Sequence, residues 1–357
     1  MADESDPEHS GSHIFDGIPL TRRRALAAVV GLGAIGVGTY FGVSSCSNSP
    51  APVAHPKPTP KPSPKPKPTP KPTPLGNPLT GIGVAGHVLA VKIDNVGQAQ
   101  GQHAGLNSAD LVYVIQVEGG LSRYLAVFDS NHIPRSVGPV RSARQTDIPL
   151  LAPYGRVGLA YSGAILGLLK YLGRANLQNI TPSDAAQLFS NGGTSPTYIS
   201  PARVFSTYPQ LAQAPDVGFR FGAIPPGGKA TASVSVSMPA ASFTFTASGN
   251  QWLVSCDGSP AMTIDQGRAS ADNVIIQHVN VVQGKFTDHN AAQPANEVFS
   301  ETTGHGAADF YRDGYVWHGQ WSKPTDGSPT SYTVNGAQMQ LKPGRTWIVL
   351  LGTGYVG

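Results

Sequence analysis

The stretch LVYVIQVEGGLSRYLAVF, residues 111–128, decides the fold class that the sequence predicts. Residues 111–117 and 123–128 are rich in branched and aromatic side chains, and Glu118-Gly119-Gly120 lies between them as a turn. Two such runs separated by a short glycine-containing segment predict a β-hairpin. Residues 88–93 and 157–161 predict two further strands, and 164–172 has the spacing of a helix.

The C-terminal part has a different pattern, because its β-rich runs are separated only by Gly, Asn, Asp or Pro. These runs are 233–245, 252–255, 274–282, 315–320, 338–341 and 346–351. We therefore expect an α+β protein, with an N-terminal mixed α/β subdomain at 77–225 and a mainly antiparallel β subdomain at 226–357. No internal repeat is present.

The first 45 residues have the features of an export signal. Thr21-Arg22-Arg23-Arg24-Ala25-Leu26 resembles a twin-arginine motif, with Arg22 and Arg23 as its central pair. An uncharged run follows, and it ends at Val43-Ser44-Ser45-Cys46, which has the small residues and the thiol of a lipobox. The sequence predicts removal of the signal and acylation of Cys46 with fatty chains such as palmitate. A retained transmembrane helix is the alternative, since the run is just long enough.

Residues 46–76 form a linker in which proline and lysine alternate, as in KPTPKPSPKPKPTPKPTP. Proline at this density prevents packing, so we expect a disordered but extended spacer that reaches on the order of 90 Å. Five lysines of this linker account for much of the basic pI near 9.0. The remaining chain is near neutral, which gives no indication of nucleic-acid binding.

The chain contains two cysteines, Cys46 and Cys256. With Cys46 acylated, Cys256 has no partner for an intrachain disulfide, although the predicted compartment is oxidising. We expect Cys256 to be a buried apolar thiol.

A group of basic residues predicts an anion site. Arg141 and Arg144 are three residues apart, so they would share one face of a helical turn begun by Gly138-Pro139. Guanidinium groups beside free amide groups suit phosphate or carboxylate. The candidate ligand-binding residues are Lys92, Arg123, Arg141 and Arg144. The alternative is that these arginines form structural ion pairs with nearby acids.

Those acids supply a second hypothesis, because a wall-active glycosidase needs two carboxylates on either side of a sugar bond. The candidates for acid/base or structural roles are Asp94, Asp110, Glu118 and Asp147. The sequence contains no nucleophile motif, no HExxH and no nucleotide-binding loop, and it predicts no metal and no cofactor. The tryptophans from Trp252 onward are expected in the core rather than in a sugar site.

Several motifs resemble the YerB-like family of bacterial lipoproteins, whose globular part has no known function. The matching stretches are 77–81, 91–95, 105–106, 109–110, 112–113, 118–120 with Arg123, 137–144, 317–323 and 343–348. Around Ser195-Pro196-Thr197-Tyr198 the chain departs from the family, which usually has a Pro-His-Asn run there. The resemblance implies an envelope lipoprotein with N-terminal and C-terminal subdomains, and it implies no activity.

We therefore expect a lipoprotein on the outer face of the bacterial cytoplasmic membrane. Its expected role is non-catalytic binding of a cell-wall component or an envelope partner through the region of Asp94, Glu118, Arg141 and Arg144. A hydrolase or transferase acting on wall glycan is the alternative, and a carrier of a small anionic ligand is a third possibility.

Replacing Cys46 tests the anchoring. The variant Cys46→Ala lacks the thiol that receives the diacylglyceryl group, so it is expected to lose the lipid label and the processed band in cells fed a radioactive fatty acid. A labelled mature band in this variant would contradict the assignment.

Overall fold

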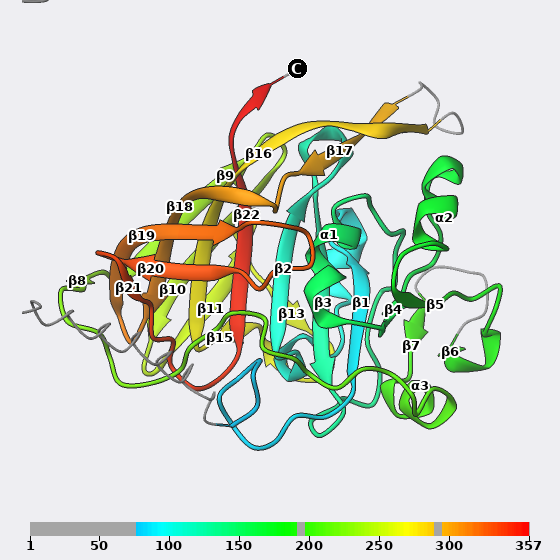
Figure 1. Cartoon of the computed structure of the whole chain (residues 1–357), viewed down its shortest axis with the longest axis horizontal. Coiled ribbons are helices and arrows are strands. Elements are labelled where there is room, and N and C mark those ends of the chain that lie inside the picture. The colour runs from blue at the N-terminus through cyan, green and yellow to red at the C-terminus, as the bar shows by residue number, and fades with distance from the viewer. Residues whose placement is uncertain (1–75, 191–196, 289–294, 357) are drawn as a thin grey trace, which may run out of the picture. The chain divides into compact units, whose positions relative to one another are not determined.

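The computed structural model describes residues 76–190, 197–288 and 295–356 (Figure 1). The predicted export segment, Cys46 and residues 46–75 of the linker lie outside the described residues, so the expectations about them stay predictions. Within the described part of the chain, no helix has both the length and the hydropathy needed to cross a membrane.

One large mixed sheet organises the described chain. Its strands, in spatial order, are β21 (Ala337–Gln338), β20 (Ser331–Val334), β19 (Tyr315–Lys323), β18 (Gly304–Arg312), β16 (Asn273–Asp288), β22 (Thr346–Val356), β2 (Leu111–Gln116), β3 (Ser122–Asp129), β1 (Val88–Asp94), β4 (Val157–Ala160) and β5 (Leu177–Ile180). Two further strands pair with it, β17 (Ala295–Ser300) with β16 and β8 (Lys229–Ala230) with β19.

The last strand, β22, joins the two halves of the sequence. It pairs in parallel with β16 on one edge and with β2 on the other, so Ile348 lies between Ile275 and Tyr113 (Figure 1). The expected α+β arrangement is therefore corrected: the described chain is mostly β, and a single mixed sheet runs through both halves. The sequence pattern identified many of the longer strands, but it carries no information about which distant strands are neighbours.

The central strands are buried on both faces, and their residues alternate between two apolar cores. Along β2, Val112 and Val114 face one core, whereas Leu111, Tyr113 and Ile115 face the other. Burial on both faces explains why these strands appear in the sequence as continuous apolar runs.

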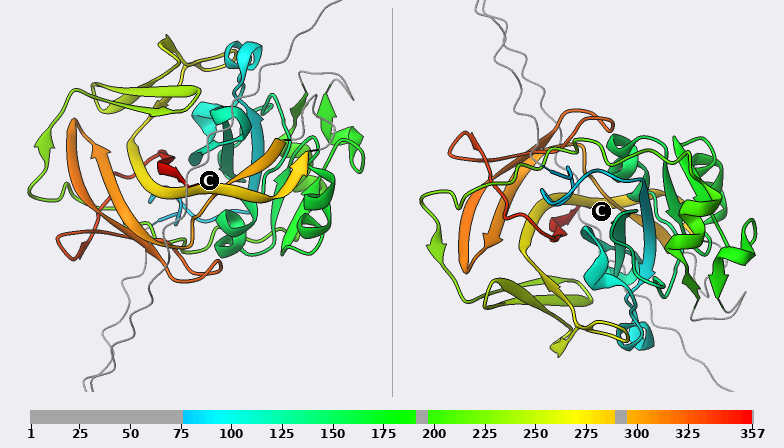
Figure 2. Two further views of the ribbon diagram at one scale, coloured as in Figure 1. Left: turned by 90° about the horizontal axis from the view of Figure 1, so that it is seen from above. Right: turned by 90° about the horizontal axis from the view of Figure 1, so that it is seen from below.

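A smaller sheet covers one face of the large sheet. Its strands are β12 (Ser259–Pro260), β11 (Gln251–Cys256), β10 (Ala241–Ser248), β9 (Ser233–Met238) and β15 (Ser270–Ala271). Figure 2 shows this yellow-green sheet as a separate layer. Two short ribbons complete the strands, β13 (Met262–Thr263) with β14 (Gly267–Arg268) and β6 (Phe189–Ser190) with β7 (Tyr198–Ile199).

Aromatic rings fill the space between the two sheets. The ring of Trp347 lies 5.3 Å from that of Tyr124 and 6.1 Å from that of Phe245, in edge-on contacts. Trp252, Trp317, Trp321 and Trp347 are all buried, which confirms that they belong to the core. Cys256 is also buried and free, and burial raises the pKa of its thiol to about 11, as expected for an inert thiol.

The other face of the sheet is covered in part by two short helices, α1 (Asp147–Leu151) and α2 (Leu166–Leu172). A third helix, α3 (Pro201–Thr207), packs through Val204 against the core that the smaller sheet covers. The helix expected at 164–172 is confirmed as α2. The run 233–245 is two strands rather than one, because Pro239-Ala240 turns the chain between β9 and β10. Strand β18 was not predicted, since its first residues, GHGAAD, lack branched side chains.

The contact between the two sheets can be tested with Trp347→Ala. This truncation leaves a large cavity under a fully buried residue, so we expect a loss of about 3–5 kcal/mol in urea denaturation. Tyr315→Ala, at a side chain that is 41% exposed, is the matched control and should cost about 1 kcal/mol or less. Equal losses in the two variants would contradict this account of the core.

Candidate functional site

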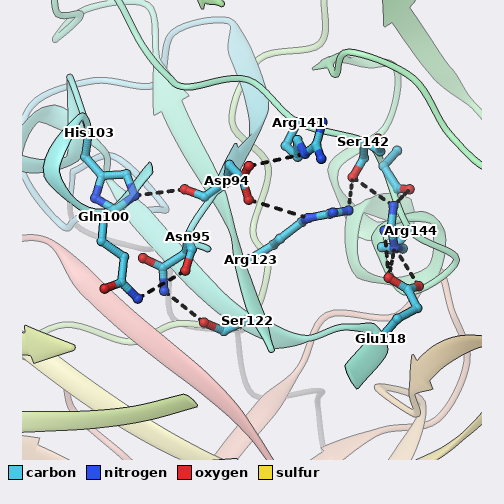
Figure 3. Close-up of polar contacts among 11 residues, drawn as sticks. Asp94, Asn95, Gln100, His103, Glu118, Ser122, Arg123, Arg141, Ser142 and Arg144 are labelled. Carbon is cyan, nitrogen blue, oxygen red and sulfur yellow. Dashed lines mark hydrogen bonds and ion pairs between the residues drawn. The ribbon is translucent and has the colours of Figure 1, made fainter. Parts of the chain in front are cut away.

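The pairing of the strands brings most of the predicted polar residues to one end of the sheet. Asp94 ends β1 and lies opposite Arg123 on β3, while Glu118 lies in the turn between β2 and β3. The segment 141–144 crosses beside this end, so its arginines meet the same acids (Figure 3). We call this group, Asp94, Glu118, Arg123, Arg141 and Arg144, the arginine cluster.

The segment that carries Arg141 and Arg144 is extended, so the expected helical turn at 138–144 is wrong. Its amide groups are used inside the protein: Val140 N–H donates to Thr197 O, and Arg141 N–H donates to Lys92 O. Helix α1 begins only at Asp147. The predicted free amide groups are therefore not available to an anion, and the two arginines are brought together by tertiary contacts instead.

Asp94 lies between two arginines. Its Oδ2 is 3.2 Å from Arg141 Nε, and its Oδ1 is 4.0 Å from Arg123 Nε. Arg123 is buried and donates from Nη1 to Ser142 O, and burial lowers the pKa of its guanidinium to about 10. Arg141, in contrast, exposes 49% of its side chain.

Glu118 and Arg144 form the most regular ion pair of the cluster. Arg144 donates from Nε to both oxygens of Glu118, at 2.8 and 3.0 Å, and from Nη2 to Oε2 at 2.7 Å. Both side chains are largely buried, so this two-point contact fixes the turn of the β2–β3 hairpin against segment 141–144.

Lys92 and Asp147 form a second, completely buried pair behind the cluster. Lys92 Nζ is 2.6 Å from Asp147 Oδ1, and neither side chain is exposed. Burial lowers the pKa of Lys92, partly offset by the charge of Asp147. Asp147 Oδ2 also accepts the backbone N–H of Arg144 at 2.7 Å. The pair thus connects β1 to the start of α1, and we assign Lys92 a structural role.

Asp110 lies away from the arginine cluster. It precedes β2 and lies beside Asp129, whose backbone N–H it accepts at 2.5 Å. Asp129 is paired with Val88 at the opposite end of β1 from Asp94, six residues away, which is about 20 Å along the strand.

Glu297 is a member of this region that the sequence did not indicate. It is fully buried on β17, and its Oε1 accepts the backbone N–H of Gln145 at 2.7 Å. Burial raises its pKa to about 7, although Arg144 opposes that shift. The available signal was its position in ANEVFS, where an acid is followed directly by the apolar residues Val298 and Phe299. An acid is seldom buried in a strand unless it has a polar partner, so this position could have indicated a polar contact.

A row of neutral polar contacts borders the cluster. His103 Nε2 is 2.8 Å from Asp94 O, and Asn95 Nδ2 donates to Ser122 Oγ at 2.8 Å (Figure 3). In residues 76–190, 197–288 and 295–356, no group of three or more His, Cys, Asp or Glu side chains is arranged to hold a metal ion.

Two family models match the chain. They are described as the N-terminal and C-terminal domains of a protein of unknown function, DUF3048, and they match residues 79–218 and 232–348. The chain belongs to the DUF3048 family. Its two-part layout agrees with the two family models, whereas the boundary near residue 225 stays a prediction.

Two comparisons with a Bacillus subtilis protein support this membership and confirm the YerB-like resemblance. The chain is 41% identical over 78 residues to the protein of strain 168 named "Putative lipoprotein YerB", a match that spans 20% of this chain and 23% of that protein. A crystal structure of YerB from Bacillus subtilis matches 78% of this chain and 96% of that one, with a TM-score of 0.64 at 21% identity. The likeness to this solved structure shows a shared fold.

The raised pKa of Glu297 predicts a pH dependence of stability. The unfolded chain loses this proton near pH 4.5 and the folded protein near pH 7, so folding is penalised as the pH rises through that window. Glu297→Gln keeps the acceptor for Gln145 and removes the titration. We measure the free energy of unfolding in urea for the variant and for the wild type. We expect the variant's value, relative to that of the wild type, to be on the order of 2 kcal/mol higher at pH 8 than at pH 4. A difference between variant and wild type that is independent of pH would contradict the assignment.

Proposed function

We propose that the protein is a non-catalytic envelope lipoprotein that binds an anionic component of the cell wall, or an acidic envelope partner, through Arg141. The observation that carries the proposal is the state of this side chain. Its Nε is held by Asp94, and its two Nη groups have no hydrogen-bond partner among the described residues, while half of the side chain is exposed. A guanidinium that is fixed at one edge and open at the other suits a phosphate or carboxylate ligand.

The surrounding pairs make this binding role more plausible than catalysis. A glycosidase requires one carboxyl group that donates a proton and a second that faces the sugar from the other side. In the cluster, Arg144 occupies both oxygens of Glu118, and Asp94 is flanked by Arg123 and Arg141. These contacts favour a rigid support for Arg141 over an acid/base pair.

The proposed location rests on the first 46 residues and on one relative. Arg22, Arg23 and Cys46 stand in the order that a twin-arginine lipoprotein signal requires. The protein that shares 41% identity over 78 residues is itself named "Putative lipoprotein YerB". A lipid on Cys46, followed by the Pro/Lys linker, would hold the folded part on the outer face of the cytoplasmic membrane.

Arg141→Ala tests the contact. The full-length protein in detergent is incubated with purified cell-wall sacculi that retain their phosphate polymers, and the bound fraction is measured against salt. We expect Arg141→Ala to lower the association constant about tenfold and to flatten its salt dependence, because one charge-assisted contact is lost.

The matched control is Arg174→Ala, which removes an exposed arginine elsewhere on the surface and should bind as wild type does. The single Arg141 variant is preferable to a double variant with Arg144, because loss of Arg144 would leave Glu118 unpaired. Equal recovery of the wild type and Arg141→Ala would refute the proposal.

A further inference from the structure

A cavity of about 420 Å³ lies at the opposite end of the sheet from the arginine cluster. Three stretches that carry the family resemblance meet there, namely 77–81, 109–110 and 343–345. Asp129, at the end of β3, also lines it. Neither the arginine cluster nor the proposed contact through Arg141 uses any of these residues.

The walls of the cavity are built by specific hydrogen bonds. Asp129 Oδ2 accepts from Asn77 Nδ2 at 3.0 Å and from the backbone N–H of Gly86, and its Oδ1 accepts from the backbone N–H of Asn131 at 2.8 Å. Thr80 O accepts the N–H of Gly344 at 2.8 Å. Loops from both halves of the sequence are thereby fixed around one space.

The glycines at 86 and 344 are required by this construction. A Cβ at Gly344 would overlap the carboxylate of Asp272, and a Cβ at Gly86 would overlap Asp129 and Ser130. At both positions the backbone therefore approaches a carboxylate more closely than any side chain would permit.

The charges around the cavity are largely compensated. Arg345 donates from Nη1 to Asn107 Oδ1 at 3.0 Å, and its backbone N–H donates to Asp272 Oδ2 at 2.9 Å. Asp129 is satisfied by three donors. Asp110 is only 6% exposed, and burial raises its pKa to about 7, so near neutral pH a large fraction of it carries a proton.

The lining therefore offers hydrogen-bond donors and acceptors without a strong field of one sign. Two of its amide side chains, Asn77 and Asn107, use both Nδ2 hydrogens for hydrogen bonds inside the protein. Asn131 Nδ2 donates only to Val84 O, so this amide can still donate to and accept from a ligand. Ile82 and Val84 line the same cavity and are 59% and 73% exposed, which supplies an apolar surface at the rim. A bound cation or anion would need a charged side chain without a partner. Asp129, Asp272 and Arg345 already have partners inside the protein.

We propose that this cavity is a binding site for a neutral saccharide, with Asp110, Asn131 and His132 as hydrogen-bond partners of its hydroxyl groups. Each sugar hydroxyl donates and accepts, which matches an amide, an imidazole and a carboxyl group. The C–H faces of a sugar ring fit against Ile82 and Val84. The site is separate from Arg141 and does not depend on the function proposed above.

The test uses the full-length protein in detergent and two neutral disaccharides, N,N′-diacetylchitobiose and maltose, with saturation-transfer NMR as the readout. We expect at least one of them to bind to the wild type. Asp110→Asn keeps an acceptor for Asp129 N–H but loses the carboxyl group, and it should weaken binding about tenfold. Arg174→Ala is the control and should bind as the wild type does.

His132→Ala is a second variant, because this exposed side chain lines the cavity and its loss should not disturb folding. We expect binding about threefold weaker. The proposal is overturned if neither disaccharide binds to the wild type, if both variants retain the wild-type affinity, or if calcium chloride shifts the protein spectrum at these residues and the sugars do not. None of these outcomes bears on the binding of wall sacculi through Arg141.

Discussion

Strand β22 forms hydrogen bonds along both of its edges, with β16 on one side and β2 on the other, and the remaining layers pack against the sheet that it completes. Both pairings are parallel, so they connect segments that are far apart in the chain. The residues of β22 alternate between the two cores, with Trp347 and Val349 on one side and Ile348 and Leu350 on the other. Strand β22 therefore holds the two halves of the family's layout in one body.

This sheet also determines where polar groups can gather. Its central strands are apolar on both faces, so charges are found mainly where the strands end. At one end, Lys92, Arg123 and Arg144 are each neutralised by a carboxylate, which keeps buried charges from destabilising the fold. Arg141 differs from them, because it is partly open to solvent. This partial exposure of Arg141, beside arginines that are buried, is the feature on which the proposed binding role rests.

The opposite end has a different electrostatic character. Loops from residues 77–84, 107–110, 129–132 and 343–345 surround a cavity in which the charged groups already have partners. One end of the same strands thus presents a cation, and the other presents neutral hydrogen-bonding groups. Under the two proposals made above, one rigid sheet would carry two binding surfaces of different chemistry, one for an anion and one for a neutral sugar.

The sequence by itself determined the strands β1 to β4, β9 to β11, β16, β19 and β22, as well as helix α2, because alternation and turn residues are local signals. It also indicated the family, through the matching motifs. It further predicted that Asp94, Glu118, Arg141 and Arg144 lie in one region, which the structure shows. Only the tertiary structure decided that one sheet unites the two halves, that segment 138–144 is extended, and that Asp110 lies about 20 Å away from Asp94. The physical reason is that strand neighbours and ion-pair partners depend on contacts between residues distant in the chain, which local composition does not encode.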